Sequence, residues 1–121
     1  MQTLQFHHVG IPVPDKMSEM DYNENLKIYT TNIFENPYGI EWMYFDHDKS
    51  LPDIIKKNPH VAYVVDNLLE AIKDKKIIRA PESPIDGVTV AFILEGDNLI
   101  ELLQFDRPEN EIWPHPNKFK I

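Results

Sequence analysis

Apolar and polar residues alternate along much of the chain, and this pattern predicts a series of short strands. In residues 4–13, for example, the alternation places His8 on one face of a strand and Val9 and Ile11 on the other. Several of these segments are also rich in β-branched and aromatic residues. The predicted strands are Leu4–Val13, Leu26–Ile33, Ile40–Phe45, His60–Val65, Ile77–Ile78, Val88–Leu94 and Leu99–Phe105.

Helices are predicted in two of the intervening segments. Asp15–Asn25 begins with an N-cap residue, and Asn67–Lys75 follows Asp66, which we expect to cap it. The inner stripe of the second helix would consist of Leu68, Leu69 and Ile72. The predicted connections are a polar linker at Asp46–Pro59 with one helical turn at Pro52–Lys56, a loop at Pro81–Gly87, a hairpin turn at Glu95–Asn98 and an irregular tail from Asp106. The chain therefore reads as an α+β protein.

Two of the predicted strands nearly repeat each other. Residues 40–46 (IEWMYFD) and 100–106 (IELLQFD) share isoleucine, glutamate, phenylalanine and aspartate at matching positions. Each repeat also begins with a histidine that opens an apolar run, His8 in the first half and His60 in the second. The pattern indicates a duplicated module with one histidine and one glutamate per copy.

These repeated polar residues are the candidate chemistry of the chain. A carboxylate in an apolar run is costly to bury unless a partner compensates it. Two modules side by side would gather His8, Glu41, His60 and Glu101 on one concave face, where two imidazoles and two carboxylates suit one divalent ion such as Zn, Ni, Co, Fe or Mn. The alternative interpretation is a pair of structural histidines and glutamates that face water. His7, His47 and His115 are expected at the surface.

Composition narrows the choice further. The 121 residues suit one domain, and the absence of cysteine leaves His, Asp and Glu as metal ligands. The net charge of −8 and the lack of a basic stripe argue against nucleic acid as a partner. Neither a long apolar span nor a signal-peptide pattern occurs, so we expect no membrane association and a cytoplasmic location.

Three segments resemble the vicinal oxygen chelate superfamily, which has the glyoxalase/bleomycin resistance protein/dioxygenase fold. His8–Asp15 (HVGIPVPD) is similar to its first strand, His60–Asp66 (HVAYVVD) to its fifth, and Asn98–Gln104 (NLIELLQ) to its last. The resemblance implies a single domain over residues 1–121, in which two βαβββ modules pair into an open, cup-shaped mixed β-sheet barrel around a metal ion, usually within a homodimer. Module one would cover about 1–50, module two about 59–106, and a C-terminal tail 107–121.

The first module is shorter than the second. His60 and Glu101 are 41 positions apart, whereas His8 and Glu41 are 33 apart. The helix is the part that the first module is expected to lack. This shortening affects the assignment of Glu41 as a ligand more than that of the other three residues. It also changes the wall of the pocket that would face a substrate.

The resemblance is strongest to glyoxalase I and methylmalonyl-CoA epimerase, and it implies a lyase or isomerase acting on a small carbonyl compound through a metal-stabilised enediolate. His8, Glu41, His60 and Glu101 would bind the metal, with Glu101 or Glu41 as the catalytic base. One alternative is a dioxygenase or a fosfomycin-type thiol transferase that uses His8, His60 and Glu101 alone. Another is a metal-free binding protein of the bleomycin-resistance type.

Overall fold

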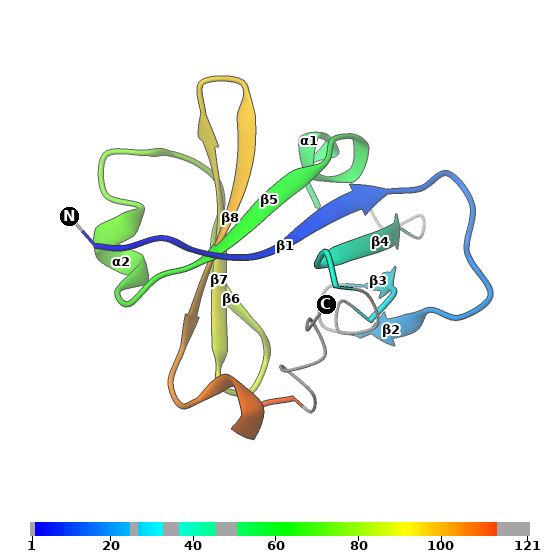
Figure 1. Ribbon diagram of the computed structural model, residues 1–121. Coiled ribbons are helices and arrows are strands. Elements are labelled where there is room, and N and C mark those ends of the chain that lie inside the picture. Colours follow the sequence, from blue (N-terminus) through cyan, green and yellow to red (C-terminus); the bar gives the residue numbers. More distant parts are fainter. Residues whose placement is uncertain (1, 25–26, 33–36, 46–50, 114–121) are drawn as a thin grey trace.

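The computed structural model describes residues 2–24, 27–32, 37–45 and 51–113, which form a strand-rich α+β fold (Figure 1). Within these ranges eight strands make one mixed sheet that curls into a half-barrel. The strands are β1 Gln5–Pro12, β2 Asp21–Asn23, β3 Ile28–Thr30, β4 Ile40–Phe45, β5 His60–Val64, β6 Lys76–Ile85, β7 Val88–Glu95 and β8 Asn98–Phe105. The helices are α1 Asp53–Lys57, α2 Leu68–Ala71 and the short 3-10 helix η2 Glu109–Glu111. The predicted α+β class is confirmed.

The strand order of the sheet is the same on both sides of its centre. The order is β2-β3-β4-β1-β5-β8-β7-β6, with β1 and β5 antiparallel in the middle (Figure 1). On each side the central strand pairs in parallel with the glutamate strand, β4 or β8. Gly10 lies opposite Glu41, and Ala62 lies opposite Glu101. In each half, therefore, the residue two positions after the histidine faces the glutamate.

The predicted helix at Asp15–Asn25 is wrong for the described part of that segment, residues 15–24. No helix forms there, and Asp21–Asn23 is instead the edge strand β2. The segment has few apolar residues with which a helix could pack on the sheet. As a strand it brings Tyr22 opposite Tyr29, with ring centroids 4.8 Å apart, and Tyr29 in turn lies opposite Tyr44. These cross-strand aromatic pairs favour the strand.

The helix predicted at Asn67–Lys75 is present but shorter. Its N-cap is Asn67 and not Asp66, because the Asn67 side chain accepts a hydrogen bond from the Glu70 backbone N–H at 3.1 Å. The backbone of Asp74 has a positive φ of 63°, which does not continue a helix. The predicted inner stripe is right for Leu68 and Ile72, but Leu69 is 72% exposed.

We expect Asn67→Ala to lower the free energy of unfolding by about 1 kcal/mol, because it removes this N-cap. Urea titration followed by circular dichroism measures the change. Asn67→Ser, which retains a capping oxygen, is the matched control and should recover most of the loss. Equal losses in the two variants would contradict the capping role.

The loop predicted at Pro81–Gly87 is also wrong in part. Strand β6 continues through this region to Ile85, with register irregularities against β7. Two prolines are compatible with a strand here because β6 is the last strand of the sheet. In an edge strand, a proline is tolerated where its backbone nitrogen faces away from the one neighbouring strand, because no ladder hydrogen bond is lost there. The predicted hairpin turn at Glu95–Asn98 is confirmed, with Gly96 at a φ of 62°.

Buried apolar residues cover both faces of the sheet. On one face, Leu68 of helix α2 and Ile72, its C-cap residue, pack against β7 and β8. On the concave face Val88, Val90 and Leu103 pack beside Ala62. Helix α1 adds Ile55 beside Phe92 and Leu99. No helix in the described ranges has the length and apolar character of a membrane span.

Candidate metal centre

The four predicted site residues come from the four central strands. His8 lies on β1, Glu41 on β4, His60 on β5 and Glu101 on β8. Strand register puts His8 and Glu101 on either side of Ala62. It puts Glu41 and His60 on either side of Gly10. Because both intervening residues are very small, the larger side chains can meet above them on the concave face.

Three of the four side chains converge closely enough to hold a metal ion. His8, His60 and Glu101 each offer a ligand atom, and these atoms lie within 4.8 Å of one another. Glu101 Oε1 is 3.2 Å from His8 Nε2 and 3.1 Å from His60 Nε2. All three residues are buried, with at most 9% of their surface exposed. We refer to them as the His-His-Glu group.

The nitrogen atoms of this group fit a cation better than they fit a hydrogen-bond network. His8 Nε2 and both ring nitrogens of His60 are buried without a hydrogen-bond partner in the described structure. The two Nε2 atoms are close to the carboxylate, but the ring geometry does not form a good hydrogen bond with it. Buried polar atoms are costly without a partner. A divalent cation would supply one for the two Nε2 atoms.

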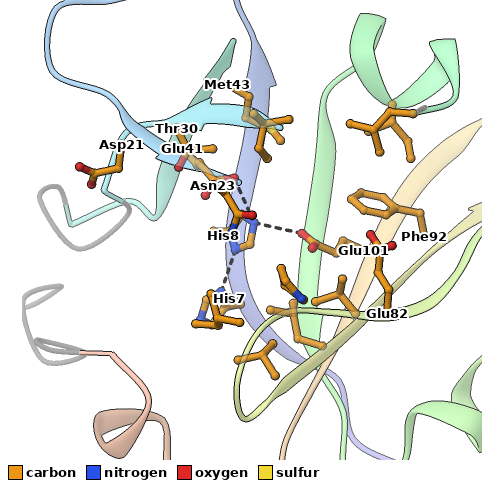
Figure 2. Close-up of a pocket in the computed structure, with 18 of the residues that line it drawn as sticks. His7, His8, Asp21, Asn23, Thr30, Glu41, Met43, Glu82, Phe92 and Glu101 are labelled. Carbon is orange, nitrogen blue, oxygen red and sulfur yellow. Dashed lines mark hydrogen bonds and ion pairs between the residues drawn. The ribbon is translucent and has the colours of Figure 1, made fainter. Parts of the chain in front are cut away.

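Glu41 lies at the edge of the His-His-Glu group. Its Oε1 atom is 3.7 Å from His8 Nε2, and its side chain is 19% exposed. Figure 2 shows His8 between the two carboxylates, Glu41 and Glu101. Among the described residues, the close group does not include Glu41. The structure thus brings all four predicted residues into one region, three of them tightly.

The environments of the two glutamates push their pKa values in opposite directions. Burial alone would raise the pKa of Glu101, but the adjacent His60 and His8 outweigh it and hold that pKa well below its usual range. Burial raises the pKa of Glu41, and His8 offsets this only in part. Burial lowers the pKa of His8, but the charges of Glu41 and Glu101 outweigh it and raise that pKa overall.

A cavity of about 380 Å³ opens over the site. His8, Glu41 and Glu101 line it, together with apolar side chains such as Phe92 and Val90. Within the described lining, Arg79 is the one arginine or lysine, and Glu82 binds its guanidinium with both oxygens, at 2.6 and 2.8 Å. The cavity therefore presents mainly apolar and acidic groups to a ligand.

His7 is not the surface residue that the sequence predicted. Its side chain is 7% exposed, and it lines the cavity beside His8 (Figure 2). The reason is a register shift between Phe6 and His8 in the pairing of β1 with β5, which interrupts the strict alternation of side chains. His47 and His115, the other two predicted surface histidines, lie outside the described residues.

Two further residues support the site and were not singled out from the sequence. Gly10 leaves the space in which the His60 ring lies, since a Cβ atom there would be 2.2 Å from His60 Cε1. A glycine inside a strand pattern is a recognisable sign of such a close approach. Glu109 accepts hydrogen bonds from His7 and from Trp113, at 2.6 and 2.8 Å. No local sequence pattern identifies a partner 102 positions away.

No protein-family model matches the sequence, and no curated protein matches it either. The curled mixed sheet and the His-His-Glu group are compatible with a vicinal oxygen chelate fold.

Proposed function

We propose that this protein is a metal-dependent enzyme of the vicinal oxygen chelate type, a lyase or isomerase that acts on a small carbonyl compound. One divalent ion, of Zn, Ni, Co, Fe or Mn, would be held by His8, His60 and Glu101. The observation that carries the proposal is the convergence of two unpartnered imidazole nitrogens on one buried carboxylate. Two histidines and a carboxylate leave further coordination positions for substrate.

Glu41 is the proposed catalytic base. When bound, the cation supplies Lewis-acid stabilisation of the negative charge that develops on vicinal substrate oxygens as an enediolate forms. Glu41 lines the cavity and is more exposed than the His-His-Glu group, so its carboxylate can reach a proton on the carbon next to a substrate carbonyl. Glu101, held between the two histidines, is assigned to the metal.

The symmetry of the sheet supports the duplicated-module part of the proposal. Going outward from the centre of the sheet, β1 is followed by β4, β3 and β2, and β5 is followed in the same way by β8, β7 and β6. In both halves the glutamate pairs with the residue two positions after the histidine. We propose two βαβββ modules, of which the first has lost its helix. The sheet also ends in two edge strands, β2 and β6, which we propose are protected in a homodimer.

The lining of the cavity favours a small substrate with little negative charge. Asp21, Glu41, Glu82 and Glu101 contribute carboxyl groups, and the Arg79 guanidinium is already paired with Glu82. A polyanionic substrate would be repelled by these carboxylates, and the described lining residues include no arginine or lysine that is not already paired. Phe92, Val90 and Leu103 offer an apolar wall. We infer a substrate with a short apolar portion and a carbonyl group beside a second oxygen.

A second candidate function follows from the position of Glu41 outside the close group. His8, His60 and Glu101 alone form the two-histidine, one-carboxylate ligand set of iron(II) oxygenases and of manganese-dependent thiol transferases. In either case Glu41 would line the substrate pocket without taking a proton. Oxygen consumption by the iron-loaded protein would favour the oxygenase.

The first experiment measures metal binding and carbon-acid chemistry in the same samples. Calorimetric titration of the wild-type protein with Zn²⁺, Ni²⁺, Co²⁺ and Mn²⁺ should give about one ion per chain for at least one of them. The metal-loaded protein is then incubated in D₂O with dihydroxyacetone, glyceraldehyde or acetoin, and proton exchange beside the carbonyl is followed by NMR. No uptake of any ion would contradict the metal centre and leave a metal-free binding protein as the better account.

Glu41→Gln separates the two candidate functions. If Glu41 is the base, this variant should bind metal within a few-fold of wild type while carbon-bound proton exchange falls about 100-fold or more. Glu95→Gln is the matched control, because it makes the same chemical change at an exposed residue outside the cavity lining and should leave proton exchange at the wild-type rate. Full exchange activity in Glu41→Gln would rule out Glu41 as the base.

A further inference from the structure

A chain of hydrogen bonds connects the His-His-Glu group to the residues that follow the last strand. The Nδ1 atoms of His8 and His7 are 2.7 Å apart, and His7 Nε2 is 2.6 Å from Glu109 Oε2. The same carboxylate oxygen accepts the Trp113 indole N–H at 2.8 Å. The contact of His8 with His7 appears as a dashed line in Figure 2.

The His7 ring is fixed by packing as well as by these hydrogen bonds. The ring centroids of Phe105 and Trp113 both lie 5.9 Å from that of His7. Phe105 and Trp113 are also in edge-to-face contact with each other, at 5.7 Å and 87°. Glu109 belongs to η2, so the segment after β8 supplies the hydrogen-bond partner of His7.

The chemistry of these groups sets the direction of the hydrogen bonds. Indole N–H groups only donate and ionised carboxylates only accept. Glu109 therefore accepts a hydrogen bond from the N–H at His7 Nε2, and a neutral His7 ring then has a lone pair on Nδ1. His8 must donate to that lone pair from its own Nδ1. The remaining nitrogen of His8, Nε2, is left without a proton, and it is the atom that points at Glu101.

We propose that His7 and Glu109 are positioning residues that hold His8 as the Nδ1-protonated tautomer, so that its Nε2 lone pair can bind the cation. The inference rests on the metal centre proposed above. Metal-binding histidines usually donate their second N–H to a neighbouring acceptor, and loss of that acceptor typically lowers metal affinity 10–100-fold. Here the acceptor is a second imidazole, that of His7, which in turn donates its own N–H to the Glu109 carboxylate.

The test compares two replacements of His7. The side-chain oxygen of His7→Asn lies near the place of Nδ1 and can accept the hydrogen bond from His8, whereas His7→Leu fills similar space without an acceptor. We expect His7→Leu to bind Zn²⁺ about 10–100-fold more weakly than wild type, and His7→Asn to recover most of that loss. Competition with a chromophoric chelator measures the affinities. Thermal unfolding of the metal-free variants shows whether both are folded.

A second measurement reads the tautomer directly. Long-range ¹H–¹⁵N NMR spectra of the histidine rings distinguish Nδ1–H from Nε2–H, and we expect His8 to carry its proton on Nδ1 in the zinc-loaded wild type. The same spectrum of the metal-free protein, recorded at a pH where the rings are neutral, should show this tautomer in wild type and a mixture in His7→Leu and Glu109→Gln.

The outcomes separate the two proposals. If the wild type takes up no divalent ion, the metal centre fails, while the metal-free spectra still decide whether His7 fixes the His8 tautomer. If zinc binds but His7→Leu and His7→Asn have equal affinities, or if His8 carries its proton on Nε2, the positioning role is wrong and His7 is a packing residue.

Discussion

Glu101→Gln is expected to lower divalent-metal affinity more than any other single substitution in this protein, by more than about 100-fold. That figure is the upper end for losing an outer-shell partner, and Glu101 is proposed as a direct ligand. Its Oε1 atom lies 3.1–3.2 Å from two imidazole nitrogens. The amide that replaces the carboxylate is isosteric but uncharged, so the substitution removes the negative charge with which Glu101 would bind the cation. Calorimetric titration with Zn²⁺ and Co²⁺ measures the loss.

The control for this experiment is Glu95→Gln. Glu95 lies at the end of β7, is exposed, and pairs with Lys75. It undergoes the same chemical change far from the His-His-Glu group and should leave metal binding at the wild-type value. Metal affinity in Glu101→Gln within ten-fold of wild type would show that Glu101 is not a ligand, even if the protein binds metal elsewhere.

The sequence was sufficient to locate the His-His-Glu group because its geometry depends on strand periodicity. Period-two alternation fixes which face of a strand a residue occupies, and a repeated histidine and glutamate then select the same face twice. The structure places His8, His60 and Glu101 together, with Glu41 beside His8. The strands that carry them deviate from the predicted bounds by one residue at most at either end.

The features that the sequence did not reveal depend on local departures from periodicity. Alternation would send His7 and His8 to opposite faces, but the register shift after Phe6 brings both into the cavity lining. The partner of His7 comes from η2, after the last strand, where no pattern extends. The wrong helix prediction for the described residues 15–24 has another cause, since cross-strand tyrosine pairing favours a strand where helix packing offers little.

Gly10 shows how much the site depends on a residue with no chemistry of its own. It lies directly across from His60 on the paired strand, and its missing side chain leaves the space for the imidazole. An added Cβ atom would be 2.2 Å from His60 Cε1 and 2.8 Å from Met43 Sδ. The methionine is flexible, but the His60 ring is confined, with the Phe92 ring 5.1 Å away. The ring therefore has to move.

We expect Gly10→Ala to remove most metal binding, because His60 Nε2 can no longer stay beside Glu101. Overpacking should also lower the free energy of unfolding by about 1–3 kcal/mol. Gly96→Ala is a demanding control. It costs about 1–2 kcal/mol through its left-handed backbone, with φ at 62°, yet its Cβ atom would meet nothing within 4 Å. A similar loss of stability with normal metal binding in Gly96→Ala would separate the two effects.

A double variant then tests whether the His60 ring is what the new methyl group displaces. In a His60→Ala background the space beside residue 10 is already open, so Gly10→Ala should cost less there than in the wild type. The difference between the two costs should be about 0.5–3 kcal/mol, as for residues in direct contact. Additive losses in urea titrations would mean that the new methyl group does not displace the His60 ring. Full metal affinity in Gly10→Ala would mean that His60 can bind from another position. The close packing of β1 on β5 would then have no part in shaping the metal centre.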